Sequence, residues 1–137
     1  MNKINYNNLL YWITMLGLLI WFSYTKGWIF ANFKSISAED AYVLMQNDTN
    51  VTLVDVRTID EFKSRHVAGA KLMPLSELKN NLAQLQTHKK TQILVYCQTG
   101  RRSVSASRIL ENSGFTPINI EGGIIAMSHV GFNIERE

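Results

Sequence analysis

Cysteine is almost absent from this chain of 137 residues, which contains Cys97 and no other. A single cysteine forms no internal disulfide, so the chain is not one of the small secreted domains that disulfides hold together. It also excludes a zinc site built from several thiolates, and we expect no metal centre. The chain has no internal repeat and no low-complexity stretch. Its length is that of one domain, with little room for a second.

Net charge is absent from residues 36–137. The whole chain has 14 basic and 11 acidic residues, and three of the basic ones, Lys3, Lys26 and Lys34, precede that range, which leaves 11 of each sign. The pI near 9.1 therefore reflects the N-terminal segment. Because nucleic-acid-binding domains concentrate Lys and Arg on one face, we expect no nucleic acid partner.

Charged side chains are missing from the 22 residues between Lys3 and Lys26, and most of this run is strongly apolar. A helix rises about 1.5 Å per residue, so about 20 residues cross the hydrocarbon core of a bilayer. Aromatic residues gather toward both ends of the run, as they do at membrane interfaces. The run predicts a transmembrane helix at about 6–25, within an N-terminal segment 1–31 that a linker, 32–36, joins to a domain at 37–137.

Two other interpretations of the run fit its sequence less well. A cleaved signal peptide has an apolar region of about 7–15 residues that ends in small residues. This run is longer and aromatic at its far end, and its candidate cleavage site begins with Ile29. A buried core helix of a soluble domain would show a polar face, which the run lacks.

Membrane orientation depends on few residues. Lys26 and Lys34 follow the run, whereas Lys3 and the α-amino group precede it, so the positive-inside rule gives only a small preference for a cytoplasmic C-terminal domain. A reactive thiol in a chain without disulfides suits a reducing compartment. We therefore predict a single-pass membrane protein with its globular domain on the cytoplasmic side.

Residues 37–137 alternate between apolar runs and segments of helical spacing, which is typical of an α/β domain with a mostly parallel sheet. The predicted strands are 51–56, 70–73, 92–96 and 117–120. The predicted helices are 38–46, 59–65, 75–85, 103–112 and a short one after Gly122-Gly123. Ser37 and Thr58 are placed as N-caps, and Glu61 completes a capping box with Thr58.

Candidate functional residues follow the two longest predicted strands, because ligand sites in open α/β sheets lie beyond the carboxyl ends of strands. Asp55 and Arg57 stand at the end of the first, and Cys97 stands directly after the second. Loop amides, the N-terminus of the next helix and two arginines would all favour the thiolate of Cys97 over the thiol. The predicted anion-binding loop comprises Gln98, Thr99, Gly100, Arg101, Arg102 and Ser103. The alternative is an inert cysteine packed as a small hydrophobe, which this loop context disfavours.

Taken together, these segments resemble a single rhodanese (sulfurtransferase) domain from about Ser37 to Ile134. The motifs that carry the resemblance are Val54-Asp-Val-Arg57 with Glu61-Phe62, His66-Val-Ala-Gly-Ala70 with Pro74, Cys97-x-x-Gly100-x-Arg102-Ser103, Gly114-Phe115 and Glu121-Gly-Gly123. The resemblance implies a five-stranded, mostly parallel sheet flanked by helices, with Cys97 as the nucleophile that accepts sulfur. Met127 stands where the family often has tryptophan, and methionine can fill the same apolar space.

Three matching residues are assigned supporting roles. Asp55 is expected to shape the Cys97 loop, either by hydrogen bonding to it or by pairing with Arg57. Glu61 is expected to cap a helix. His66 is expected to pack in a turn rather than to act as a general base, because the family chemistry needs an activated thiolate and not a Cys–His pair.

The resemblance implies a reaction in two halves without a metal or organic cofactor. Cys97 takes sulfur from an anionic donor such as thiosulfate and passes it to a thiol or protein acceptor. One alternative is a cysteine phosphatase or arsenate reductase, whose loop reads Cys-x5-Arg, but here the position after five intervening residues is Ser103. The other alternative is a membrane-tethered sulfur-relay or protein-binding module with little turnover of small molecules.

Overall fold

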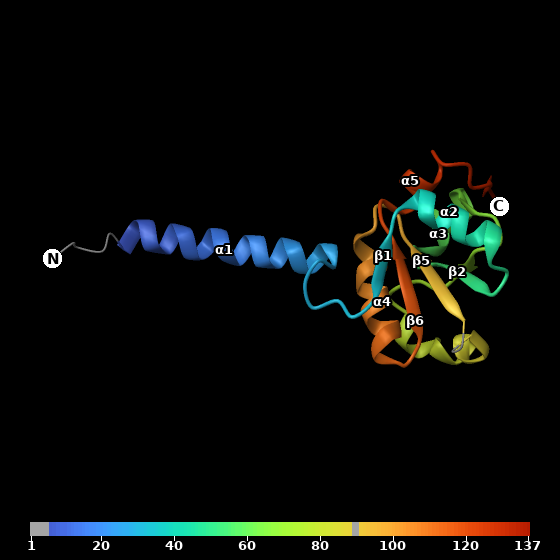
Figure 1. The fold of residues 1–137 in the computed structure, drawn as a ribbon, viewed down its shortest axis with the longest axis horizontal. Coiled ribbons are helices and arrows are strands. Elements are labelled where there is room, and N and C mark those ends of the chain that lie inside the picture. The colour runs from blue at the N-terminus through green and yellow to red at the C-terminus, as the bar shows by residue number, and fades with distance from the viewer. Residues whose placement is uncertain (1–5, 89–90) are drawn as a thin grey trace. The chain divides into compact units, whose positions relative to one another are not determined.

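The structure, a computed structural model, describes residues 6–88 and 91–137 (Figure 1). The first five residues of the predicted N-terminal segment, with Lys3 among them, and Lys89-Lys90 lie outside these ranges. The chain divides between Ala31 and Asn32 into two compact units, and each is described by itself.

The first unit contains α1 (Tyr6–Lys26), a helix of 21 residues of which none is buried. By length and composition it is long and apolar enough to cross a membrane, and a signal sequence meets the same two criteria. The hydroxyls of its two threonines are hydrogen-bonded within the helix. Thr14 Oγ1 donates to the Tyr11 carbonyl, and Thr25 Oγ1 donates to the Phe22 carbonyl, both at 2.8 Å. Such bonds make a hydroxyl compatible with apolar surroundings.

The second unit is built on a five-stranded sheet in which every neighbouring pair is parallel, as predicted. Its strand order is β1-β6-β5-β2-β4. The strands are β1 (Lys34–Ile36), β2 (Val51–Asp55), β4 (Lys71–Leu72), β5 (Gln92–Tyr96) and β6 (Thr116–Ile120). The two central strands β2 and β5 pair so that Asp55 is opposite Tyr96, which brings both carboxyl ends to one edge.

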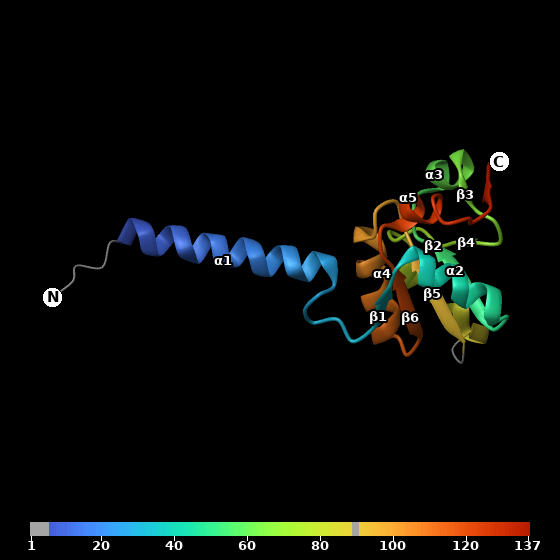
Figure 2. The same ribbon diagram turned by 45° about the horizontal axis from the view of Figure 1, so that its top comes forward.

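Helices cover both faces of this sheet (Figure 2). Each face has its own apolar core. On one face, α2 (Ala38–Asn47) and α5 (Gly123–Met127) pack over side chains such as Leu94 and Ile120. On the other, α4 (Arg101–Asn112) and two 3₁₀ helices, η1 (Leu78–Asn80) and η2 (Leu82–His88), pack over side chains such as Val54 and Val95. A sheet buried on both faces explains why its strands are nearly continuous apolar runs.

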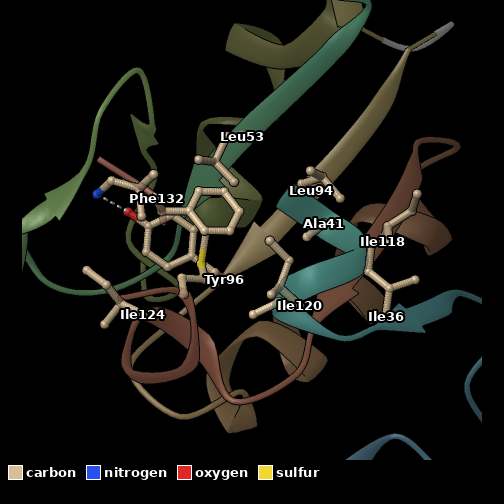
Figure 3. Close-up of a cluster of buried hydrophobic side chains, with 12 residues drawn as sticks. Ile36, Ala41, Leu53, Leu94, Tyr96, Ile118, Ile120, Ile124 and Phe132 are labelled. Atoms are coloured by element: carbon tan, nitrogen blue, oxygen red, sulfur yellow. Dashed lines mark hydrogen bonds between the residues drawn. The ribbon is translucent and has the colours of Figure 1, made fainter. Parts of the chain in front are cut away.

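A small second sheet lies outside the main one. The strands β3 (His66–Val67) and β7 (Ile134–Glu135) pair antiparallel, and α3 (Ile59–Ser64) precedes β3. The Val67 amide donates to the Tyr96 hydroxyl at 3.1 Å, the dashed line in Figure 3. This bond ties the small sheet to the last residue of β5.

Local sequence signals account for the helix starts. Ser37 Oγ accepts from the Asp40 amide at 3.1 Å, which makes Ser37 the N-cap of α2 as predicted. Thr58 and Glu61 form the predicted capping box of α3. Met127, the departure from the family pattern, is fully buried in the α2–α5 core.

Three sequence predictions need correction. Residues 75–85 are predicted as one helix, but the chain forms the separate short helices η1 and η2 there, because Leu78 and Leu85 alone are deeply buried and a short 3₁₀ turn suffices to place each. The predicted linker 32–36 contains β1, an edge strand whose three residues, Lys34–Ile36, include too few apolar side chains to show a strand pattern. The helix predicted from Ser103 begins earlier, at Arg101.

Candidate active site

Cys97 directly follows β5 and lies at the carboxyl edge of the sheet, where sequence analysis expects it. The residue is 1% exposed and belongs to the α4-side apolar core, which also contains Val56 and has Leu75 packed against it. Its Sγ accepts a hydrogen bond from the Gly100 amide at 3.1 Å. The loop therefore folds back over its own sulfur and presents a backbone N–H to it.

Gly100 makes this turn possible. Its φ of +97° is in the left-handed region that favours glycine, and a Cβ there would approach the Gly122 amide nitrogen to 3.2 Å. Gly100 is the N-cap of α4, and its carbonyl accepts from Ser103 Oγ at 3.1 Å. Because α4 begins directly after the loop, its N-terminal partial positive charge favours an anion on Cys97.

The glycine pair at the start of α5 holds the loop from the other side. The Ile124 amide donates to the Cys97 carbonyl at 2.8 Å, and the Ile125 amide donates to the Gln98 carbonyl at 3.4 Å. A Cβ on Gly123 would overlap the Cys97 carbonyl oxygen. The sequence predicts Gly122-Gly123 as a turn before a short helix and as part of a family motif, but not as a contact with the Cys97 loop. A glycine pair close after a buried strand is a signal of close approach between two backbones.

Asp55 and Arg57 form a buried ion pair beneath the loop. Arg57 Nη2 lies 2.7 Å from Asp55 Oδ2, and the two side chains are 1% and 0% exposed. The same guanidinium donates to the Gln98 side-chain oxygen at 3.3 Å and to the Arg65 carbonyl at 2.6 Å. Burial alone would lower the pKa of Arg57, but the hydrogen bonds and charge of Asp55 outweigh it and raise that pKa. Of the two expected arrangements for Asp55, the structure has the pair with Arg57.

Tyr96 lies beneath this pair. The Arg57 guanidinium carbon is 5.7 Å from the centre of its ring. Burial, together with the charge of Asp55, raises the pKa of the Tyr96 phenol above its ordinary value. The phenol is therefore neutral at physiological pH and serves as a fixed polar contact inside the core.

Arg102 forms a second, more exposed ion pair with Glu61. Its Nη1 and Nη2 each donate to one carboxylate oxygen at 2.7 Å, and the two side chains are 35% and 32% exposed. The bidentate hydrogen bond from Arg102 lowers the pKa of Glu61 to about 2 and raises that of Arg102. Arg102 is expected from the sequence to add positive charge to the Cys97 loop, and Glu61 is expected to cap a helix. In the structure Glu61 caps α3 and also pairs with Arg102, whose guanidinium it orients.

The other predicted loop residues surround the same turn. Ser103 is fully buried, Gln98 is half-buried, and Thr99 and Arg101 are exposed. His66 is buried and stacked on Phe62, and its Nδ1 lies 2.9 Å from the Phe62 carbonyl, in keeping with the packing role expected for it. Within residues 6–88 and 91–137, no group of three or more His, Cys, Asp or Glu is placed to hold a metal ion.

A recess opens beside the loop, with a volume of about 310 Å³. Val56, Pro74 and Leu75 give it apolar walls, and Arg57 and Arg102 also line it. Val56 belongs to the apolar cluster that contains Cys97, and Leu75 packs against that cluster. Arg57, which lines the recess, donates to the side chain of Gln98, the residue after Cys97, so the recess borders the Cys97 loop.

The arrangement has counterparts among known proteins. Residues 37–129 match the family model described as a rhodanese-like domain. The chain belongs to the rhodanese family. Among curated rhodanese relatives, thiosulfate sulfurtransferase PspE of Escherichia coli is 38% identical over 79 residues, which cover 56% of this chain and 76% of PspE. The putative sulfur carrier protein YrkF of Bacillus subtilis is 31% identical over 90 residues, but this chain spans only 48% of its length.

Solved structures agree on the fold. A rhodanese-like domain protein from Staphylococcus aureus superposes with a TM-score of 0.68 at 29% identity, covering 77% of this chain and 99% of that one. The predicted rhodanese-like α/β fold with its five-stranded parallel sheet is thereby confirmed.

Proposed function

We propose that this protein is a sulfurtransferase that carries a sulfane sulfur on Cys97. The observation that most supports the proposal is the position of Cys97 at the carboxyl end of β5, with the Gly100 amide directed at its Sγ at 3.1 Å. The relative named thiosulfate sulfurtransferase makes thiosulfate the first donor to test.

The first half-reaction is a displacement on sulfur. The Cys97 thiolate attacks the outer sulfur of thiosulfate, the S–S bond of thiosulfate breaks, and its electron pair leaves with sulfite. The product is a Cys97 persulfide. The Gly100 amide and the N-terminus of α4 stabilise the anion before and after transfer. Gln98 to Ser103 form the loop around it, and Asp55 with Arg57 holds that loop through Gln98.

The second half-reaction returns the enzyme to its starting state. An acceptor thiolate, or cyanide in an assay, attacks the outer sulfur of the persulfide, and the S–S electron pair returns to Cys97 Sγ. No oxidant, reductant or cofactor enters either half. The covalent intermediate predicts ping-pong kinetics.

The loop favours this reaction over phosphate transfer. A cysteine phosphatase needs an arginine five intervening residues after the cysteine, and Ser103 occupies that position. Ser103 Oγ is bonded to the Gly100 carbonyl, and the neighbouring Arg102 is held by Glu61. The shorter loop suits a single sulfur better than a tetrahedral phosphate.

A sulfur relay between protein partners is the second candidate. The observation that favours it is the pairing of both arginines at the recess, since Asp55 neutralises Arg57 and Glu61 neutralises Arg102. The recess therefore attracts a small dianion less strongly than it would if both guanidiniums were unpaired. A relay would load sulfur on Cys97 but turn over slowly with small acceptors.

We further propose that α1 anchors the domain to a membrane in a single pass, with segment 1–31 in or at the bilayer and the domain, which begins at Asn32 and includes β1, facing the cytoplasm. The absence of charged side chains from Tyr6 to Thr25 and the absence of any buried residue in α1 support this layout. Alkaline carbonate should leave the full chain in the membrane fraction. Protease should digest the domain in inside-out vesicles but spare it in right-side-out vesicles; the reverse pattern would refute the orientation.

Steady-state kinetics test the sulfurtransferase proposal. The full chain in neutral detergent is assayed with thiosulfate and cyanide, with Cys97→Ser as control. For the wild type we expect parallel lines in double-reciprocal plots, measured over many turnovers. The Cys97→Ser control should show no activity. A single turnover of bound sulfur would favour the relay, and equal rates with the Cys97→Ser protein would refute both candidates.

A further inference from the structure

The recess beside Cys97 continues outward along the surface. A second depression, of about 340 Å³, shares Thr58, Pro74 and Ser76 with it and extends to Asp60 and Glu77. The two form one groove between the start of α3 and the segment 74–77, here called the acceptor groove. Thiosulfate or cyanide would occupy only a small part of its length.

The chemistry of the acceptor groove changes from its inner to its outer end. The inner end is apolar, with Val56 from the cluster that contains Cys97 and Leu75 packed against that cluster. The outer end carries two exposed carboxylates, Asp60 and Glu77, beside the half-exposed Ile59. The outer end is therefore acidic, and its charge is not offset by Arg57 and Arg102, which already pair with Asp55 and Glu61.

We propose that the acceptor groove binds a polypeptide acceptor that presents a cysteine at the inner end, an apolar side chain next to it and basic residues at the outer end. This inference rests on the proposed function, because the bound cysteine receives sulfur from the Cys97 persulfide. Its thiolate attacks the outer sulfur, the S–S bond to Cys97 breaks, and the electron pair returns to Sγ. The acceptor leaves as a persulfide, with no change in total oxidation state.

Charge complementarity selects this occupant over two others. Anionic lipid headgroups would be repelled by Asp60 and Glu77. A second copy of the chain offers no projecting thiol that could enter the groove, because its one cysteine, Cys97, is recessed beneath its own loop. A basic cysteine-containing segment meets both the apolar and the acidic ends of the groove.

The test measures discharge of a preloaded persulfide. The full chain in neutral detergent is loaded with thiosulfate, loading is verified by intact mass, and short peptides containing cysteine, leucine and two lysines are added. Matched peptides carry glutamates in place of the lysines, and each pair is made with the cysteine at either end. Every rate is divided by that peptide's rate with a small-molecule disulfide, which corrects for differences in thiol reactivity.

The lysine peptides should discharge Cys97 about tenfold faster than the glutamate peptides at low salt, with the ratio approaching one at high salt. In Asp60→Lys/Glu77→Lys the ratio should fall to one or below. The control Glu39→Lys/Glu111→Lys, which makes the same charge change away from the groove, should keep the wild-type ratio.

Failures of the two proposals are distinguishable. If thiosulfate does not load Cys97, the proposed function fails. If Cys97 loads but the wild-type ratio is near one at low salt, or both double variants change it equally, the acceptor groove is refuted. If the lysine peptides discharge Cys97 in detergent but not in anionic nanodiscs, the groove binds lipid. If discharge weakens as the protein concentration rises, the groove binds a second copy of the chain. Either result overturns the proposal.

Discussion

Two arginine–carboxylate pairs flank the Cys97 loop, and they differ chiefly in burial. Arg57 and Asp55 are 1% and 0% exposed, whereas Arg102 and Glu61 are 35% and 32% exposed, yet the shortest N–O distance is 2.7 Å in both. Equal geometry does not imply equal energy, because removing one partner of a buried pair leaves a charge without water or counter-charge. An exposed pair is screened by solvent and contributes little.

The comparison assigns the pairs different tasks. The buried pair also bonds to Gln98 and to the Arg65 carbonyl, so it fixes the base of the loop to the rest of the domain. The exposed pair lies at the recess, where it neutralises and orients Arg102 while Glu61 caps α3. We therefore expect the first pair to control stability and the second to adjust the charge of the site.

Breaking the buried pair should have the largest effect. Asp55→Asn should lower the free energy of unfolding by about 3–5 kcal/mol, because Arg57 would keep its charge in a buried site. Denaturant titration followed by far-UV circular dichroism measures this, since all three tryptophans lie in the N-terminal segment and do not report on the domain. Asp55→Leu/Arg57→Met should recover part of the loss. A single variant as stable as the wild type would contradict the assigned role.

The backbone contact behind the loop should rank second. Gly123→Ala introduces a Cβ that overlaps the Cys97 carbonyl at a φ of +57°, so we expect a loss of about 1–3 kcal/mol and slower persulfide formation. Gly114→Ala is the matched control, because its φ is +84° but nothing lies within 4 Å of the added Cβ. Equal losses of persulfide formation in the two variants would show that the contact with Cys97 does not matter.

Breaking the exposed pair should change stability by about 1 kcal/mol or less. Glu61→Gln keeps a side chain able to complete the capping box while it removes the charge that neutralises Arg102. The KM for thiosulfate should therefore fall about two- to threefold, because an unneutralised guanidinium lines the recess. Glu39→Gln, which removes a carboxylate in the first turn of α2 that lines neither depression, serves as control for thiosulfate kinetics. A KM that rises in Glu61→Gln would refute this account of the pair.

The smallest effect should appear in the acid dependence of stability. The pKa of Glu61 is lowered from 4.5 to about 2 in the folded protein, so its contribution is present above pH 4.5 and is lost as pH falls toward 2. Wild-type stability should decline more steeply than that of Glu61→Gln across this interval. Parallel stability–pH curves for the two proteins would show that the ion pair with Arg102 contributes nothing to the native state.

Features encoded by neighbouring residues were predictable from the sequence. The strands β2 and β5 stand out as continuous apolar runs because both of their faces are buried, and the Thr58–Glu61 cap is visible because its partners are three residues apart. Their carboxyl ends then indicate where Cys97 and Asp55 lie. The motifs around Cys97 supplied the resemblance to the rhodanese family.

Features that depend on distant partners were not predictable in this way. Arg102 meets Glu61 from 41 positions away, and the Gly123 contact with Cys97 joins two loops that only the folded sheet brings together. The edge strand β1 has three residues and pairs with β6, which lies far along the chain, so its own composition shows no pattern. Roles for the individual loop residues, Gln98 to Ser103, remain proposals.

The central claim is that Cys97 carries the transferred sulfur, and intact mass spectrometry tests it most directly. The full chain and its Cys97→Ser variant are incubated with thiosulfate, separated from the reagent and weighed before and after cyanide. We predict a gain of one sulfur atom in the wild type alone, which cyanide removes. No gain in the wild type, or an equal gain in the Cys97→Ser protein, would contradict the account.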